Sequence, residues 1–230
     1  VDLGLQWLAK VQHADGHWEY GPNIGDYPVG ATALATLAFL GAGHTHRSDG
    51  PYRATVQRAL RFLLQSQNAD GRFLDHKFYS HGVATMAVCE AIGMTKDVNL
   101  FPAARRALNC IFTNMGPAGG FGYDGPGDDT HVTSFQVMGL KSAQLVSLNV
   151  PPERTRRLLD YYDRALNPDG TTRYRADGGH VTPARTALGL FCRLLLGVSC
   201  KDPRVVLIAG RLDRAGPEVT NYFQTYYGTY

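Results

Sequence analysis

The sequence predicts an all-α fold in which amphipathic and apolar helices alternate along the chain in two concentric layers. Three observations indicate this fold class. A helical segment that ends in a polar turn, a glycine and an aromatic residue recurs about every 50 residues. The helices between these turns have two different hydrophobic patterns. The chain of 230 residues is 44% hydrophobic and 19% charged, which is enough for one compact domain with a sizeable core.

The repeat is clearest in its first two copies, which share the pattern Gln-x-x-Asp-Gly-x-aromatic at residues 12–18 and 67–73. Two weaker copies follow further along the chain. The key glycines are spaced by 55, 49 and 50 residues and are Gly16, Gly71, Gly120 and Gly170. Glycine tolerates the left-handed conformation in which helices often end, so each copy predicts a helix end. A period of this length is typical of helix-pair repeats.

The first helix of each pair is amphipathic, with apolar residues at helical spacing and polar residues opposite. Such a helix buries one face, so these helices are expected in the outer layer. They are predicted near residues 3–12, 53–67, 102–115, 154–167 and 202–213.

The second helix of each pair is apolar nearly all round and is therefore expected in the more buried inner layer. Pro183 suits the first turn of one of them. The inner helices are predicted near residues 29–40, 82–92, 132–146 and 183–196, and a fifth near Val219. In this arrangement all the inner helices begin at the same end of a barrel.

Charge and cysteine content exclude several classes of protein. The chain has 23 Lys and Arg against 20 Asp and Glu, and a net charge of +3 does not indicate a nucleic-acid-binding protein. No apolar run reaches the ~18 residues that a membrane span needs. The four cysteines form no C-x-x-C pair and are predicted to be free thiols, most of them buried. They are compatible with the cytoplasm, although the sequence does not fix the compartment.

The Gln-x-x-Asp-Gly-x-aromatic copies resemble the Gln-Trp repeat of squalene and oxidosqualene cyclases, which protein prenyltransferase β subunits share. The resemblance covers essentially the whole chain and is closest to bacterial squalene-cyclase-like proteins with prenyltransferase/squalene-oxidase repeats. Segments 81–91, 136–143 and 226–229 carry it as well. It implies an α/α toroid of about five helix pairs over residues 1–230, in a group that mostly has no established activity. The repeat specifies the fold more strongly than the chemistry.

Asp128 and Asp129 are the candidate catalytic residues, in the segment Pro-Gly-Asp-Asp-Thr that precedes an inner helix. Triterpene cyclases carry Asp-x-Asp-Asp-Thr at a similar place, and the resemblance puts Asp128 at the position of the proton donor. Pro126 stands where the first aspartate is expected, so the motif is incomplete. The alternative is that both aspartates cap the following helix, whose free N–H groups and dipole favour carboxylates.

His81, His131 and His180 each lie at or just before the start of an inner helix. On a common rim they would be candidate ligand-binding residues, or zinc ligands, because imidazoles and carboxylates bind this ion. Prenyltransferases and lanthionine cyclases use zinc in such toroids, but their ligand motifs, which include a cysteine, do not match here. No cofactor is therefore expected, with zinc as the alternative. Structural roles in loops and caps compete with both hypotheses.

Aromatic residues near the inner-helix starts are candidates for binding an apolar small molecule, namely Tyr27, Phe78 and Tyr79. Those at the repeat position itself are expected to pack between repeats. Glu90 lies in an apolar helix and is expected to pair with Arg105 or Arg106, because a buried carboxylate needs a partner.

Two functions remain open. The first is a non-catalytic binding or scaffold domain, and the second is an enzyme, either cyclase-like with Asp128 as general acid or zinc-dependent. No cyclisation of squalene is expected from this chain alone, because the motif is incomplete and a second toroid domain has no room. Five pairs would leave the end helices without neighbours, so a C-terminal continuation or a protein partner is expected. The residues expected to be exposed there are Leu5, Leu8, Val206, Leu207 and Ile208.

Overall fold

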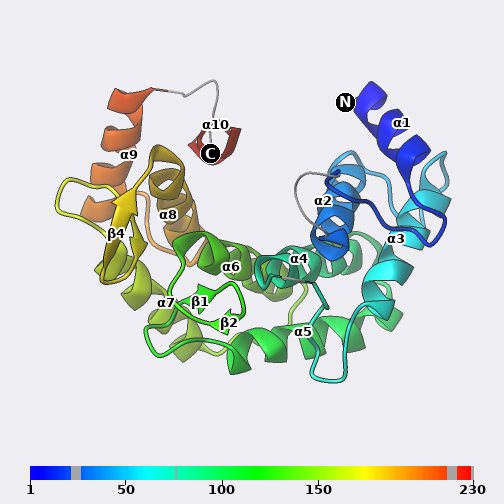
Figure 1. Ribbon diagram of the computed structural model, residues 1–230, viewed down its shortest axis with the longest axis horizontal. Helices are drawn as coiled ribbons and strands as arrows, with labels where there is room; N and C mark the ends of the chain where they lie inside the picture. The colour runs from blue at the N-terminus through cyan, green and yellow to red at the C-terminus, as the bar shows by residue number, and fades with distance from the viewer. Residues whose placement is uncertain (22–26, 76, 217–221, 229–230) are drawn as a thin grey trace. The chain divides into compact units, whose positions relative to one another are not determined.

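The computed structural model describes residues 1–21, 27–75, 77–216 and 222–228. These residues form helices in alternating pairs with few short strands, which confirms the all-α prediction (Figure 1). The first helices of the pairs are α1 (Asp2–Val11), α3 (Arg53–Gln65), α5 (Phe101–Thr113), α7 (Pro152–Ala165) and α9 (Pro203–Ala215). The second helices are α2 (Pro28–Gly41), α4 (Tyr79–Thr95), α6 (Thr130–Leu145), α8 (Pro183–Leu195) and α10 (Tyr222–Gly228). Val219, the expected start of the last helix, lies outside the described residues.

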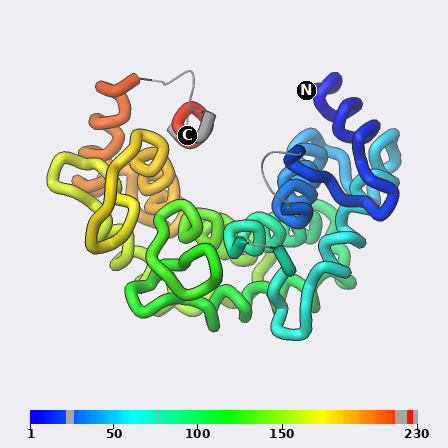
Figure 2. Tube along the Cα trace, in the orientation of Figure 1, coloured from blue at the N-terminus to red at the C-terminus, as the bar shows by residue number. Residues whose placement is uncertain are grey.

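The chain divides into two compact units, which can be followed along the trace in Figure 2. The N-terminal unit comprises Val1–Thr113 and Gly139–Asn149. The C-terminal unit comprises Asn114–Met138 and Val150–Tyr230. Helix α6 supplies its first part to the C-terminal unit and its last part to the N-terminal unit.

Helices α2 and α4 pack against each other in the N-terminal unit and are more buried than the helices that precede them. Nine of the 14 residues of α2 and eleven of the 17 of α4 are buried, against five of 13 in α3. This is the predicted difference between the apolar and the amphipathic helices. Fully buried side chains such as Phe39 and Leu63 each contribute about 1.5–3 kcal/mol to folding.

The repeat glycine lets the turn approach the next amphipathic helix. Gly71 has φ +85°, and a Cβ at this position would lie 2.2 Å from the carbonyl oxygen of Arg106. The side-chain amide of Gln67 donates to the carbonyls of Gly71 and Ala103, both at 3.0 Å. The guanidinium of Arg106 donates to Gln67 Oε1 at 2.6 Å. Gln12, Gly16 and Arg58 repeat this arrangement, which explains the Gln-x-x-Asp-Gly pattern.

In each of the four repeats, one polar side chain of the second helix binds the turn. It accepts a hydrogen bond from the backbone N–H of the second residue after the repeat glycine. The four pairs are Trp18 with Thr32, Phe73 with His81 Nδ1, Phe121 with Thr133, and Thr172 with Thr186.

These hydrogen bonds define the register of the repeats, and two residues assigned from the sequence prove wrong. The glycine of the third copy is Gly119, which has φ +86° and packs against the Arg157 carbonyl, rather than Gly120. The aromatic position of the fourth copy is occupied by Thr172, so Tyr174 does not have the packing role expected for it.

The turns of the C-terminal unit extend into two antiparallel hairpins. Strands β1 (Phe121–Gly122) and β2 (Gly125–Pro126) form the first. Strands β3 (Arg173–Arg175) and β4 (Gly178–Val181) form the second. Helix α8 is not apolar all round as predicted, because it carries Arg185 and Arg193, which are 8% and 1% exposed. Arg193 pairs with Asp163 of α7 at 2.5 Å.

The partner predicted for Glu90 is wrong. Its carboxylate accepts a hydrogen bond from the Ser142 hydroxyl at 2.6 Å, while Arg106 is bound to Gln67. All four cysteines are free, as predicted, and only Cys200 is exposed. Among the described helices, none combines the length and the apolar character that a bilayer-spanning helix needs.

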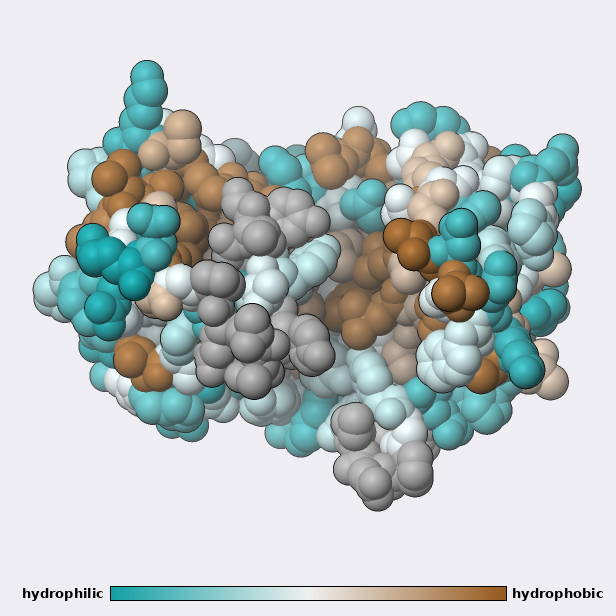
Figure 3. Space-filling view, turned by 90° about the horizontal axis from the view of Figure 1, so that it is seen from above, coloured by the Kyte–Doolittle hydropathy of each residue, from teal (hydrophilic) through white to brown (hydrophobic). Residues whose placement is uncertain are grey.

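Exposure of the end helices follows the prediction only in part. Val206 and Leu207 of α9 are 57% and 38% exposed, but Ile208 and Leu5 are buried. Leu8 is half-buried. Apolar side chains also reach the surface elsewhere, as the brown atoms of Figure 3 show.

Candidate functional site

The predicted site residues fall into the two units. Tyr27, Phe78, Tyr79 and His81 belong to the N-terminal unit, at or beside the starts of α2 and α4. Asp128, Asp129, His131 and His180 belong to the C-terminal unit, around the starts of α6 and α8.

His81 and Phe78 are parts of the core. His81 is completely buried, its Nδ1 accepts from the Phe73 N–H at 3.2 Å, and its Nε2 donates to the Ala107 carbonyl at 3.1 Å. Burial lowers the pKa of His81 to about 4, so the ring is neutral. The Phe78 ring is also buried and stacks on His81, with centroids 5.0 Å apart. Neither nitrogen of His81 is left for a metal or a ligand, so the three-histidine hypothesis loses one of its ligands.

Tyr27 and Tyr79 do lie together, with ring centroids 6.0 Å apart. A Cβ on Gly30 would lie 3.3 Å from the hydroxyls of both Tyr20 and Tyr79. Both hydroxyls therefore lie against the first turn of α2. Asp75 accepts a hydrogen bond from the Gly30 N–H at 3.0 Å. Burial raises the pKa of Tyr20 and of Tyr79, so both phenols keep their protons. This part of the predicted apolar pocket is therefore a polar, hydroxyl-rich cluster.

Asp128 and Asp129 both accept hydrogen bonds from the backbone. Asp128 Oδ1 accepts from the N–H of Ala176 at 3.0 Å and ties the second hairpin to the start of α6. Asp129 Oδ1 accepts from the N–H groups of His131 and Val132 at 2.8 and 3.0 Å. Asp129 therefore has the geometry of a helix N-cap, whereas Asp128 binds the hairpin, so the alternative in which both aspartates cap the helix holds only for Asp129.

The second oxygen of Asp129 is different. Asp129 is 4% exposed, and its Oδ2 meets no donor at hydrogen-bonding geometry among the described residues. The hydroxyl of Tyr174 is its neighbour. The Asp129 carboxylate, together with burial and the nearby Tyr123, raises the pKa of Tyr174, whose phenol therefore remains a hydrogen-bond donor.

Tyr174 is surrounded by cationic and imidazole groups. The ring of His180 stacks on it with centroids 5.7 Å apart, and the Arg185 guanidinium lies 4.7 Å from its centroid. Arg185 donates to the His180 carbonyl at 3.1 Å, but its buried Nε has no hydrogen-bond partner in the described chain. Burial and the charge of Arg185 lower the pKa of His131, which is therefore a neutral imidazole near pH 7.

These residues form one group, which we call the Tyr174 cluster: Asp129, His131, Tyr174, His180 and Arg185. The structure thus brings together Asp129, His131 and His180 of the predicted site, with Asp128 beside them through its bond to the second hairpin. Sequence reasoning missed Tyr174 and Arg185. The available signal was Arg185 itself, a charge in the first turn of a helix that was expected to be apolar.

Comparisons with known proteins identify the fold. No model of a known protein family matches the chain, and no curated protein matches it either. Among solved structures, it is similar to cellobiose 2-epimerase from Spirochaeta thermophila, with a TM-score of 0.66 and 14% identity. It is also similar to an α-1,6-mannanase of Salegentibacter (TM-score 0.67, 12% identity) and to the type II terpene cyclase MstE from Scytonema (TM-score 0.60, 15% identity).

These likenesses cover 92%, 96% and 90% of this chain. The chain spans only 66% of the epimerase and 60% of the cyclase, and 71% of the mannanase. The identities are low, so the likenesses concern the fold. The neighbours are α/α-toroid proteins, and the chain has the α/α-toroid fold that its Gln-x-x-Asp-Gly-x-aromatic repeat predicts.

Proposed function

We propose that this protein is a binding domain of the α/α-toroid fold that takes a carbohydrate at the Tyr174 cluster. The observation that carries the proposal is a buried acceptor and a buried donor in the same cluster, Asp129 Oδ2 and Arg185 Nε, that make no hydrogen bond of regular geometry in the described chain. Both border Tyr174. Unpartnered buried charged groups are costly, and ligand binding is one reason for a protein to keep them.

A sugar hydroxyl satisfies both groups, because it donates one hydrogen bond and accepts another. Vicinal hydroxyls supply enough donors and acceptors for the carboxylate, the guanidinium and the imidazole of His131. Tyr174 adds a phenol donor and an aromatic ring in the same place. A hydrocarbon offers none of these hydrogen bonds, so the cluster favours a polyhydroxylated ligand over the apolar molecule that the sequence suggested.

Cyclisation of a terpene is the weaker proposal. It needs a carboxylic acid that presents its proton to an alkene in a dry site. Asp128 and Asp129 instead accept hydrogen bonds from backbone N–H groups, and Pro126 occupies the position of the missing acid. These contacts support a structural role for the pair.

The similar structures support a carbohydrate as the ligand. They include the cellobiose epimerase and the mannanase, the latter in complex with α-1,6-mannotetrose. A shared fold is weaker support than the chemistry of the cluster, because one fold carries many functions.

The test is a calorimetric titration of the chain with cellobiose, α-1,6-mannotetrose and solubilised squalene. We expect binding of a saccharide and none of squalene. Arg185→Lys keeps a cation at the ring of Tyr174 but removes the guanidinium donors, and it should weaken binding at least tenfold. Arg204→Lys, at an exposed arginine of the same unit, is the matched control and should leave binding unchanged. Binding of squalene alone, or equal saccharide affinity in all three proteins, would overturn the proposal.

A second candidate is an enzyme that uses Asp128 and Asp129. One observation favours it: the inactive variant of the mannanase has two consecutive aspartates replaced. The discriminating measurement is product formation from the bound saccharide, followed by chromatography. Turnover that disappears in Asp128→Asn would favour the enzyme, whereas binding without turnover would favour the binding domain.

A further inference from the structure

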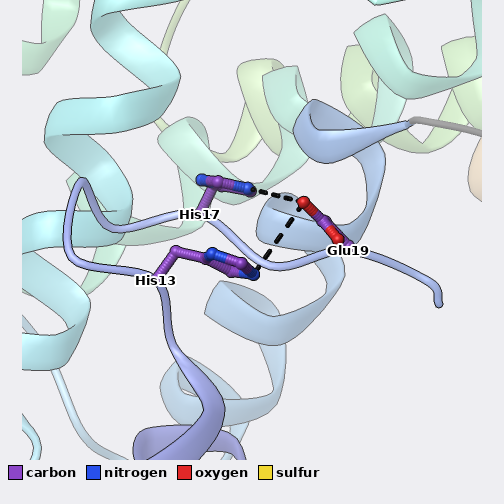
Figure 4. A group of neighbouring side chains, drawn as sticks. All are labelled: His13, His17 and Glu19. Carbon is purple, nitrogen blue, oxygen red and sulfur yellow. Dashed lines mark hydrogen bonds and ion pairs between the residues drawn. The ribbon is translucent and has the colours of Figure 1, made fainter. Parts of the chain in front are cut away.

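A second group of polar side chains lies in the turn after α1, at the first repeat and away from the Tyr174 cluster in sequence. His13, His17 and Glu19 point toward one another there (Figure 4). Both histidines direct Nε2 toward the same carboxylate oxygen, Glu19 Oε1. The function proposed above uses none of these residues.

The spacing of the three groups suits a metal ion. His17 Nε2 lies 3.3 Å and His13 Nε2 lies 3.9 Å from Glu19 Oε1, and the three ligand atoms are all within 4.8 Å of one another. A tetrahedral Zn²⁺ with bonds of 2.0–2.1 Å holds its ligand atoms about 3.4 Å apart. His13 and Glu19 are half-exposed. Their side chains can therefore rotate slightly to bring the ligand atoms to this spacing.

The ring of His17 is already held for this role. Its Nδ1 lies 2.6 Å from Asp15 Oδ1, so in the neutral ring this bond keeps the proton on Nδ1 and turns the Nε2 lone pair toward Glu19. A carboxylate that orients a ligating histidine in this way is a regular feature of metal sites. The ring also stacks on His13 at 4.2 Å and on Phe62 of α3 at 5.2 Å.

The second repeat shows that the turn does not need these side chains. There, Asn68, Arg72 and Leu74 stand at the positions of His13, His17 and Glu19. Both turns have the same backbone hydrogen bond. The N–H of His13 donates to the His17 carbonyl at 3.0 Å, and the N–H of Asn68 donates to the Arg72 carbonyl at 2.9 Å. The imidazoles and the carboxylate are therefore additions to a turn that forms without them.

We propose that His13, His17 and Glu19 bind a divalent transition metal ion, for which Zn²⁺ fits best. Two imidazoles and one carboxylate are a common zinc ligand set, and they leave the fourth position to water or to an exchangeable ligand. Asp15 is a positioning residue that orients His17. The ion would tie the end of α1 to the turn before α2.

The test uses the full chain with ZnCl₂ in calorimetry and with CoCl₂ in visible absorption. We expect one ion per chain and a tetrahedral Co²⁺ band. His13→Asn and His17→Arg install the residues of the second repeat, so the turn should still form, and each should weaken binding at least tenfold. Asp15→Asn should weaken it by about tenfold while leaving the Co²⁺ band in place.

His44→Asn, at a half-buried histidine that belongs neither to this group nor to the Tyr174 cluster, is the matched control and should leave metal binding unchanged. Circular dichroism verifies that each variant is folded. Absence of stoichiometric binding to the wild-type chain would overturn the proposal. Binding that survives in His17→Arg, or that disappears in His44→Asn, would overturn it as well.

Discussion

The two units use the same repeat but differ in the contacts that hold its turn. In the N-terminal unit a glutamine side chain binds the turn to the next helix, and an arginine completes the arrangement. In the C-terminal unit the glutamine is absent, and the turns extend into hairpins. The C-terminal unit also has charged side chains with a buried atom that makes no hydrogen bond of regular geometry within the described chain, namely Asp129, Arg173, Arg185 and Arg193. The described part of the N-terminal unit has no such carboxylate or guanidinium.

This difference separates structural polar groups from functional ones. His81 and Gln67 lie where the repeat needs them, and both make hydrogen bonds to the backbone, while the remaining oxygen of Gln67 accepts from Arg106. Asp129 and Arg185 differ, because each also has a buried atom, Oδ2 or Nε, that makes no hydrogen bond of regular geometry in the described chain. The Tyr174 cluster is therefore the place where we expect a ligand.

The glycine is common to both units, so its replacement should have the largest effect and the same size in each. Gly71→Ala and Gly119→Ala would put a Cβ 2.2 and 2.4 Å from a carbonyl oxygen of the next helix, at positive φ. We expect each to lower the free energy of unfolding by roughly 2–5 kcal/mol, measured by urea denaturation. Gly43 has φ +86° with open space around it, so Gly43→Ala should cost only about 1–2 kcal/mol. An equal loss in the free energy of unfolding at all three positions would argue against a close contact between the repeat glycine and the next helix.

The glutamine contacts should distinguish the units. Gln67→Ala removes two hydrogen bonds to backbone carbonyls and the acceptor for Arg106, so we expect a loss of about 2–3 kcal/mol in the free energy of unfolding. In the C-terminal unit, Arg157 donates to the Gly116 carbonyl at 2.7 Å instead. Arg157→Ala should cost about 1 kcal/mol. A larger loss of stability for Arg157→Ala than for Gln67→Ala would show that the turn of the C-terminal unit depends more on its side-chain contact, contrary to this prediction.

His81 should make stability depend on pH, because the equivalent positions of the C-terminal unit are threonines. Its pKa is lowered from 6.5 to about 4 in the folded chain, so the unfolded chain binds more protons below pH 6.5. The contribution of the neutral ring to stability is therefore fully present above pH 6.5 and is lost as the pH falls toward 4, by roughly 1–2 kcal/mol between pH 6.5 and 5. Urea titrations at several pH values measure this slope. His81→Thr should be less stable overall, but its free energy of unfolding should lack this dependence on pH. An unchanged slope would contradict the attribution of the pH dependence to His81.

Glu90 should matter least. Glu90→Gln keeps an oxygen that accepts the hydrogen bond of Ser142, so the free energy of unfolding should change by less than about 1 kcal/mol. Glu90→Leu removes the acceptor and should cost more. A large effect of Glu90→Gln would show that the charge itself has a partner, as the sequence suggested.

Periodicity predicted the helices well. Predicted helices with both ends described agree with the structure to within three residues at each end. Helix positions follow from spacing along one chain, which a sequence contains directly. The register of the weaker repeats did not follow, because Gly119 and Gly120 are adjacent and only the packing against Arg157 distinguishes them.

The site was harder to predict because it depends on contacts between segments. Asp129 and His131 were identified from their place before a helix, but Tyr174 and Arg185 join them through a hairpin whose fold the sequence did not reveal. His81 looked like a ligand because it precedes an inner helix. Its repeat position, occupied by threonine in the other copies, shows that it is a backbone acceptor.

The most direct test of the account compares one substitution in the two units. Asp129→Asn keeps the helix cap, because asparagine caps as well as aspartate, but it can replace the buried Oδ2 acceptor beside Tyr174 by a donor. Asp75→Asn makes the same change at the start of α2, where the carboxylate binds the Gly30 N–H. In calorimetric titrations with cellobiose and α-1,6-mannotetrose, the account predicts at least tenfold weaker binding for Asp129→Asn and no more than a twofold change for Asp75→Asn. Equal effects of the two substitutions, or no saccharide binding by the wild-type chain, would contradict it.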